Sequence, residues 1–419
     1  MKLLFGRYDR EASTLPSIEM KRSGPALTCL FFLAVFAAKF IYDGTRSQGH
    51  HLRYNLLTLA INYFQFGALR RALVGSIIYL SVIDLVTAAY LLYGVSVILI
   101  LIGAYVSLRR ITQAGGTILQ FVLILGALLL FWSEDVGRTD ILVAAILLMA
   151  ALALVDGSIV LASLYLAIGL QIHEVAAIYG LPLFVALLLE GNRYKNIDLR
   201  AAAIATLIIV GGILFYVVVW FLPHANNHFI AETIKPRLPT NYPSDATKFK
   251  ADLLQILGGG RGVVDTMCQI SHSVHYYIKP FVALLMVALA AISMSGARLK
   301  WAFAVIATVP PLLFLWMTAA DMSRWVALAI FNVWIICAVI DFEPVRGAEP
   351  EGGAKRWAWV RAVGAAAIVP LLFPLTIIPV QAFISYPSPL IEGGIEKVIG
   401  RPTIKPLDEC DPTWRALFS

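Results

Sequence analysis

Residues 141–189 read ILVAAILLMAALALVDGSIVLASLYLAIGLQIHEVAAIYGLPLFVALLL, and this stretch decides the fold. Its only acidic, basic or histidine side chains are Asp156, His173 and Glu174. The breaks at Asp156-Gly157 and at His173 divide it into three apolar helices of about 15 residues each. Such helices rise about 22 Å, less than the ~30 Å core of a bilayer. We therefore expect tilted, kinked or incompletely crossing helices.

The composition is that of a membrane protein. Of the 419 residues, 59% are hydrophobic and only 14% are charged, and the mean hydropathy is +0.80. A soluble fold cannot bury that much apolar surface, because its exterior needs a polar skin. The net charge of +7 comes with no aromatic-interleaved basic groove, and most Lys and Arg lie in short loops between apolar blocks. We expect these residues to set membrane topology, so membrane lipid is the expected partner and nucleic acid is not.

The apolar blocks predict an all-α fold, a polytopic transmembrane helical bundle of about 11 spans. Blocks of about 16 to 25 residues match the length that crosses the hydrocarbon core. The predicted spans are 26–43, 76–107, 117–133, 141–155, 158–172, 175–190, 201–222, 277–295, 301–319, 325–341 and 360–383. Residues 76–107 fit either one long tilted helix or two shorter pieces. Asp84 lies inside this block and is expected to need a polar partner in the bundle.

The basic residues of the short loops place the N-terminus in the cytoplasm, because Lys and Arg accumulate on that side of a membrane. Residues 1–22 are polar and too long before the first apolar run for a cleavable signal peptide, so the first span is expected to be retained. The predicted layout is a cytoplasmic N-terminal segment 1–25, a transmembrane domain 26–383 with outer loops 44–75 and 223–276, and an extracytoplasmic C-terminal tail 384–419.

Two helical segments are expected in the outer loops. Leu56, Leu57, Leu59, Ala60, Tyr63 and Phe64 form an amphipathic pattern, which predicts a short helix lying in the membrane interface. In the loop 223–276, the only helical signal is at 251–257.

Ionisable residues collect at the predicted outer ends of the helices. Charges at membrane depth are costly, so each one needs a reason. The set consists of Asp43, Arg70, Arg71, Glu134, Asp135, Arg138, Asp140, His173, Glu174, Asp321 and Arg324. Arginines hold phosphate oxygens bidentately, and a carboxylate takes a proton from an attacking hydroxyl. Together the residues predict a site for an anionic headgroup.

Each member also has a plainer structural explanation. Asp43-Gly44 ends a helix, and Arg70-Arg71 anchors a helix at the interface. Glu134-Asp135 forms a solvated cap, and Asp140 stabilises a helix N-terminus. A lone histidine between helices is more often structural, although an adjacent His173-Glu174 inside an apolar run is rarer and favours function. Asp321 and Arg324 fit a local i,i+3 ion pair.

The cysteines leave two alternatives open. Cys29 and Cys337 fall within spans and fit packing roles. Cys268 and Cys410 both fall outside, where an oxidising exterior would allow a disulfide, and two unpaired thiols fit equally well. Zinc-binding, P-loop and nucleophile-elbow motifs are absent from the sequence. No cofactor is required, although the pair Glu134-Asp135 is a candidate for binding a divalent metal with a substrate phosphate.

Two motifs resemble a known family. Gly137-Arg138-Thr139-Asp140-Ile141, followed by short apolar helices and 172–182 (IHEVAAIYGLP), is similar to bacterial O-antigen and exopolysaccharide polymerases of the Wzy/EpsG type. Those proteins carry an Arg that opens one helix and a later His that starts another helix leading to a Pro. Asp321-Met322-Ser323-Arg324-Trp325 resembles their later outer Arg. Asp43 occupies the position of the catalytic base in the first outer loop of membrane glycosyltransferases of the GT-C superfamily.

The resemblance implies sugar transfer from a polyprenyl-phosphate-linked sugar or oligosaccharide at the outer face of the bacterial cytoplasmic (inner) membrane. It implies that Asp43 or a member of the Glu134-Asp135 pair deprotonates the acceptor. Arg70, Arg71, Arg138 and Arg324 would neutralise the departing lipid phosphate, and His173, oriented by Glu174, would donate to it. His173-Glu174 and Arg138-Thr139-Asp140 depart from the family pattern, which leaves polymerisation and addition of a single sugar both open.

Three other classes remain alternatives. A lipid or polysaccharide transporter or flippase would need polar residues near the bilayer midplane, where only Asp84 is expected, and an internal repeat. A membrane acyl or phosphoglycerol transferase would share the phosphate site, and the lack of a Ser/His nucleophile arrangement counts mildly against it. A non-enzymatic assembly subunit would tolerate the loss of single ionisable residues.

Overall fold

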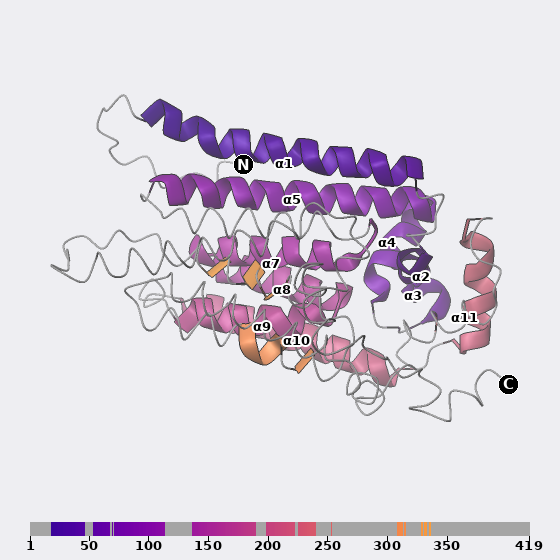
Figure 1. Cartoon of the computed structure of the whole chain (residues 1–419). Helices are drawn as coiled ribbons and strands as arrows, with labels where there is room; N and C mark the ends of the chain where they lie inside the picture. The colour runs from indigo at the N-terminus through magenta and orange to yellow at the C-terminus, as the bar shows by residue number, and fades with distance from the viewer. Residues whose placement is uncertain are drawn as a thin grey trace, which may run out of the picture.

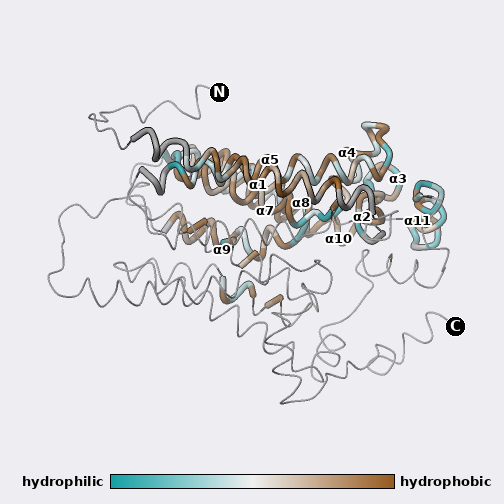
Figure 2. The backbone as a smooth tube through the Cα atoms, turned by 45° about the horizontal axis from the view of Figure 1, so that its top comes forward, coloured by the Kyte–Doolittle hydropathy of each residue, from teal (hydrophilic) through white to brown (hydrophobic). Residues whose placement is uncertain are grey.

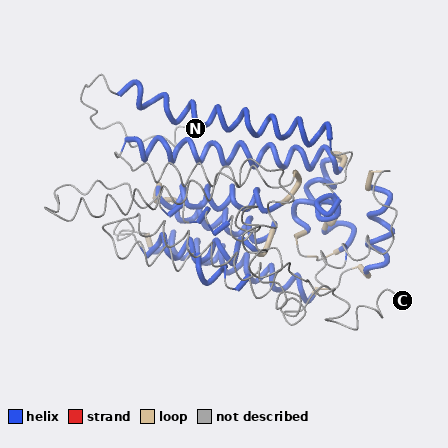
Figure 3. Tube along the Cα trace, viewed as in Figure 1, coloured by secondary structure: helices blue, strands red, loops and turns tan. Residues whose placement is uncertain are grey.

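The computed structural model describes residues 18–46, 53–67, 69, 71–113, 136–189, 198–222 and 225–239, residue 253, and short stretches between 308 and 336. Every regular element in these ranges is helical and none is a strand (Figure 3). The predicted all-α class is therefore confirmed.

The stretch that opened the sequence analysis forms three helices in antiparallel succession. They are α7 (Thr139–Val155), α8 (Ile159–Ile172) and α9 (Val175–Leu189), and both predicted breaks occur. At the first break Gly157 has φ +80°, a left-handed conformation that glycine adopts without steric cost. At the second break His173 is extended, so α8 ends one residue before it.

Two longer helices lie beside this core. α1 (Ile18–Arg46) packs along α5 (Leu85–Gln113), and α10 (Leu199–Phe221) packs on α8 (Figure 1). The side chains of Phe40 in α1 and Tyr90 in α5 meet edge to face, with ring centroids 4.9 Å apart. This contact brings the end of α1 next to the start of α5.

The predicted block 76–107 is two helices, which resolves the alternative that the sequence left open. α4 (Ala72–Ser81) ends at Val82, whose φ of 58° is left-handed, and α5 starts after Asp84. The Asp84 carboxylate accepts a hydrogen bond from the Thr87 backbone N–H at 2.9 Å. Asp84 is exposed and caps α5, so the expectation of a partner deep in the bundle was wrong.

Most of the predicted interfacial helix of the first outer loop is buried in protein, although Phe64 is 61% exposed. It forms α2 (Arg53–Ala60) and the single turn α3 (Tyr63–Phe66), between which Asn62 caps α3 by accepting from the Gln65 N–H. Leu56, Leu57, Leu59 and Ala60 are completely buried. The pattern predicted the helix correctly, but these apolar side chains contact α4 and α5 rather than lipid.

One helix in the second outer loop was missed. α11 (Asn227–Ile234) is followed by the 3-10 turn η3 (Lys235–Arg237), and residue 253 is the only described member of the predicted segment 251–257. Asn226 caps α11 by accepting from the Phe229 N–H at 2.7 Å. Ile230 and Ile234, four residues apart, are both buried. This cap and this spacing are the sequence signals that would have identified the helix.

The turn after α11 is fastened to the α2–α4 region. The Arg237 guanidinium lies 5.7 Å from the ring centroid of Tyr79 in α4, and its Nη1 donates to the Gln65 Oε1 at 3.3 Å. Partial burial lowers the pKa of Arg237, against a smaller opposing effect of Tyr79. The Ala225 N–H also donates to the Phe66 carbonyl, so α11 is held against the end of the bundle (Figure 1).

Two of the described helices are long and apolar enough to cross a membrane, over Leu85–Arg109 and Leu199–Val219. Large apolar side chains are also exposed along α5, at Leu91, Val95, Ile98 and Ile102. Figure 2 shows that hydrophobic residues predominate along this helix. A helix that is apolar on both faces is typical of a lipid environment. Of the other predicted spans, 117–133, 277–295 and 360–383 lie outside the described residues, and 301–319 and 325–341 are described only in short helical pieces. The count of eleven stays a prediction.

One end of the bundle gathers the termini of most helices. α8 ends there at His173, and α7 and α9 begin there. Gly137, just before α7, approaches Ala89 near the start of α5, and Tyr63 contacts Phe215 near the end of α10. We call this the His173 end.

Gly75 allows α4 to lie directly on the backbone between α2 and α3. A Cβ atom at this position would fall 1.8 Å from the Ile61 carbonyl oxygen and 2.8 Å from that of Leu59. Because both obstacles are backbone atoms, we expect Gly75→Ala to lower the free energy of unfolding by about 1–3 kcal/mol. The measurement is thermal unfolding of the purified protein in detergent. Gly94→Ala is the control, since nothing lies within 4 Å of its added Cβ, and equal stability of the two variants would contradict the packing.

The Asp84 cap predicts a pH-dependent contribution to stability. Hydrogen bonds from the side chain and then the backbone of Thr87 hold the pKa of Asp84 below its ordinary value. Because the pKa of Asp84 is lower in the folded protein than in the unfolded one, its carboxylate stabilises the fold at pH values above the ordinary pKa. This stabilisation is lost as the pH falls through the lowered pKa. Asp84→Ala should thus cost about 0.5–1 kcal/mol at pH 7 and less at pH 3. Unfolding curves at both pH values test this, and a pH-independent difference would contradict it.

Candidate functional site

The start of α7 is held in place by a glycine and an asparagine. Gly137 has φ +84°, and a Cβ there would come within 2.8 Å of the Cβ of Ala89. The buried Asn55 of α2 donates through Nδ2 to the Val136 carbonyl at 2.8 Å. These contacts fix the turn that presents Arg138, which is extended and immediately precedes α7.

Asp140 lies in the first turn of α7 and is only 2% exposed. Its Oδ1 and the Nη1 of Arg138, two residues earlier, are both completely buried. The positive end of the helix dipole stabilises a carboxylate at this position. Asp140 therefore has the structural role that the sequence allowed, stabilisation of a helix N-terminus. Its carboxylate also lies next to a histidine.

His173 connects α8 to α9 and is 3% exposed. Its Nδ1 accepts a hydrogen bond from the Val175 N–H at 3.2 Å, and its Nε2 lies 3.8 Å from the Asp140 Oδ1. Because a backbone N–H can only donate, this contact favours a neutral ring that carries its proton on Nε2. The Glu174 Oε2 lies 3.4 Å from Nδ1, a distance that would be a salt bridge only for a charged imidazole. The Nε2 atom faces Asp140.

Arg71 and Glu174 form a two-point ion pair across 103 positions of the chain. The Arg71 Nε donates to the Glu174 Oε2 at 2.9 Å, and its Nη2 donates to Oε1. Both side chains are mostly buried, at 13% and 24% exposure. Arg71 has φ 61°, a left-handed conformation that costs a non-glycine residue about 1–2 kcal/mol. The ion pair therefore involves a residue whose backbone conformation is strained, as is that of Val82 at the other end of α4.

Three helix N-termini converge at these residues. Arg71 precedes α4, Asp140 lies in the first turn of α7, and Glu174 precedes α9, where its carbonyl accepts from the Ala177 N–H. The contacts of Arg71 with Glu174 and of His173 with Asp140 join all three. Each helix start carries a partial positive charge, so two arginines and three dipoles place positive potential here. The two acids partly offset this potential.

Five of the residues predicted from sequence are therefore brought together: Arg71, Arg138, Asp140, His173 and Glu174. The backbone of Asp43 lies in the last turn of α1, which continues past Gly44 to Arg46, so Asp43-Gly44 does not end that helix. The remaining predicted residues lie outside the described part of the chain: Arg70, Glu134, Asp135, Asp321, Arg324, Cys268 and Cys410.

Two buried asparagines near the site were not identified from the sequence. Asn55 holds the turn before Arg138, and Asn332 donates through Nδ2 to the Tyr179 carbonyl at 3.1 Å. An asparagine next to leucines, as in Asn55-Leu56-Leu57, is the signal, since an amide in an apolar run needs a buried partner. Through this hydrogen bond, Asn332 connects its segment of the chain, which follows the candidate site residue Arg324, to α9.

Among the described residues, neither a metal-binding group nor a thiol contributes to the site. The described residues hold no group of three or more His, Cys, Asp or Glu side chains arranged to bind a metal ion. Cys29, expected to pack within a span, is unoxidised and donates its thiol to the Leu101 carbonyl of α5 at 3.7 Å.

The ion pair predicts a measurable coupling between α4 and the α8–α9 turn. Charge-assisted hydrogen bonds of partly buried groups couple by roughly 1–3 kcal/mol. Arg71→Met and Glu174→Gln should each destabilise the protein, and the double variant should be more stable than the sum of the two losses allows. Unfolding free energies of the wild type and three variants form the double-mutant cycle. Strictly additive losses would show that the pair does not stabilise the fold.

Comparisons with protein-family models, with curated proteins and with solved structures find no match for this chain. The case for a functional site thus rests on the geometry of the His173 end.

Proposed function

We propose that this protein is a membrane glycosyltransferase acting at the outer face of the bacterial inner membrane. It transfers or polymerises sugars from a polyprenyl-phosphate-linked donor during assembly of a surface glycan. In this proposal the chain is a multi-pass protein of about eleven spans, with its N-terminus in the cytoplasm and the His173 end outside. The two long apolar helices and the outward-facing apolar side chains of α5 support the membrane setting.

The observation that carries the proposal is the convergence of α4, α7 and α9 on two arginines and one buried histidine. Helix N-termini and guanidinium groups are the donors that proteins use for phosphate oxygens. The leaving group of the reaction is a lipid phosphate, which fits these donors.

We assign roles in the reaction to the five residues from their charge and exposure. Arg71, Arg138 and Glu174 are partly exposed, and we assign the two arginines to the substrate phosphate because they carry the positive charges. His173 and Asp140 lie behind them, where Nε2–H is the only ring donor and Asp140 stabilises the imidazolium that forms if the ring gains a proton. Glu174 is a positioning residue, because both its oxygens hold Arg71.

The chemistry is a single displacement at the anomeric carbon. The acceptor oxygen bonds to that carbon, the bond to the phosphate oxygen breaks, and the electron pair leaves with the phosphate. The acceptor proton passes to a carboxylate, for which Asp43 and the Glu134-Asp135 pair are the candidates. Arg70 and Arg324 would add positive charge to the leaving phosphate, with Asp321 orienting Arg324.

His173→Asn and Arg138→Ala test the proposal. Asn places Oδ1 where the imidazole has Nδ1, so it preserves the acceptor for the Val175 N–H, while it removes Nε2 and Cε1 and places its amide NH2 near the position of Cδ2. We expect wild-type folding and a loss of glycan assembly of about 100-fold. Arg138→Ala should lose as much because it removes a phosphate donor. The measurement is surface glycan in the producing cell, with the amount and thermal stability of each variant recorded.

Arg200→Ala is the matched control, since Arg200 is exposed at the start of α10, the opposite end of the bundle. It should produce glycan at the wild-type level. Normal glycan assembly by folded His173→Asn and Arg138→Ala proteins would refute the proposed site.

A further inference from the structure

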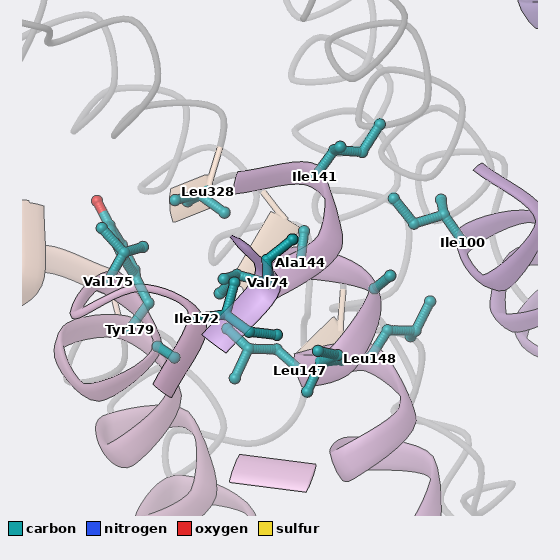
Figure 4. Packing of buried hydrophobic residues seen from close by; sticks show 14 of the residues in the cluster. Val74, Ile100, Ile141, Ala144, Leu147, Leu148, Ile172, Val175, Tyr179 and Leu328 are labelled. Atoms are coloured by element: carbon teal, nitrogen blue, oxygen red, sulfur yellow. The ribbon is translucent and has the colours of Figure 1, made fainter. Parts of the chain in front are cut away.

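α4 has two apolar faces, and only one of them packs in the core. On the inner face, Val74 points into the hydrophobic cluster with Ala144 of α7 and Ile172 of α8 (Figure 4). On the other face, Leu73, Ile77 and Leu80 are spaced i, i+4 and i+7, which aligns them along one side of a helix. Ile77 is 60% exposed and Leu80 is 63% exposed. Leu73 is partly buried and packs against the core, whereas core packing does not explain the outward position of Ile77 and Leu80.

The stripe begins at the candidate site. Arg71 immediately precedes α4, and the ion pair with Glu174 fixes its guanidinium there. At 1.5 Å per residue, Ile77 and Leu80 lie about 9 and 13 Å along the helix from Arg71. A charged donor group is thus followed, beyond the partly buried Leu73, by two exposed apolar side chains. This order matches an amphiphile with an anionic head and a long apolar tail.

We propose that the stripe of Leu73, Ile77 and Leu80 binds the isoprenoid tail of the lipid-linked donor while its phosphate lies at Arg71 and Arg138. The inference rests on the proposed function and specifies the path of its substrate. Lipid tails are as apolar as leucine, so contact with the stripe adds little hydrophobic free energy inside a bilayer. The phosphate therefore places the lipid, and the stripe directs the tail away from the site.

Photo-crosslinking tests where the tail lies. The full-length protein, with a photoreactive amino acid replacing Ile77 or Leu80, is reconstituted in vesicles of phosphatidylethanolamine and phosphatidylglycerol with a radiolabelled C55 polyprenyl phosphate. The control replaces Ile98, which is equally apolar and 53% exposed but lies in the middle of α5, a helix that carries none of the site residues. A site that prefers its ligand by 1.4 kcal/mol enriches it about tenfold. We expect labelling at Ile77 and Leu80 to exceed that at Ile98 by this factor and to saturate.

Competitors identify what the site recognises. Unlabelled polyprenyl phosphate should abolish labelling at Ile77 and Leu80, whereas C55 polyprenol, which lacks the phosphate, should not. Equal, unsaturable labelling at all three positions would mean that bulk bilayer lipid covers the stripe, which overturns the inference. Effective competition by polyprenol or by excess phosphatidylglycerol would also overturn it, because the phosphate of a polyprenyl lipid would then not place the tail.

The two proposals fail in different ways. If labelling is unsaturable but His173→Asn and Arg138→Ala abolish glycan assembly, the tail path is wrong and the glycosyltransferase site stands. If labelling saturates and the phosphate is required, but both variants assemble glycan normally, the tail path stands as a polyprenyl-phosphate site and the glycosyltransferase assignment is wrong.

Discussion

The ion pair between Arg71 and Glu174 is the constraint on which the His173 end depends. It joins the start of α4 to the turn between α8 and α9, two regions 103 positions apart. An ion pair that is mostly buried leaves an uncompensated charge when either partner is lost, so the loss of one partner destabilises the contact between the two elements. The pair also positions Glu174 beside His173, whose other side faces Asp140 at the start of α7. One contact thus determines how three helices meet.

Burial separates the roles of residues that look alike in the sequence. Arg71 and Arg138 keep partial exposure, whereas Asp140 and His173 lie behind them in the protein. A histidine whose Nδ1 accepts from a backbone N–H has one donor only, and that donor points to a carboxylate. Buried polar groups in an apolar bundle are costly unless they are paired, so an arrangement of this kind indicates a function when it also carries positive potential.

The apolar side chains of the protein differ in their surroundings and roles. The leucines of α2 follow an amphipathic pattern but are enclosed by α4 and α5, so they belong to the core. The exposed side chains of α5 have no charged site residue beside them, which fits contact with lipid tails. On α4 the same kind of exposed stripe starts at Arg71. Its position next to a charged group, rather than its apolar character, distinguishes it.

The sequence by itself determined the helical class, the helices of residues 141–189 with both breaks, and five residues that meet at one end. Those features follow from local rules, because apolar block length, Asp-Gly and an isolated His-Glu pair act within a few residues. Only the tertiary structure decided that 76–107 is two helices, that α2 is buried, and that Asp84 is a cap rather than a buried charge. It also decided that Arg71 binds Glu174 and that His173 faces Asp140. These are contacts between distant segments, and helix periodicity does not specify which faces of two helices meet.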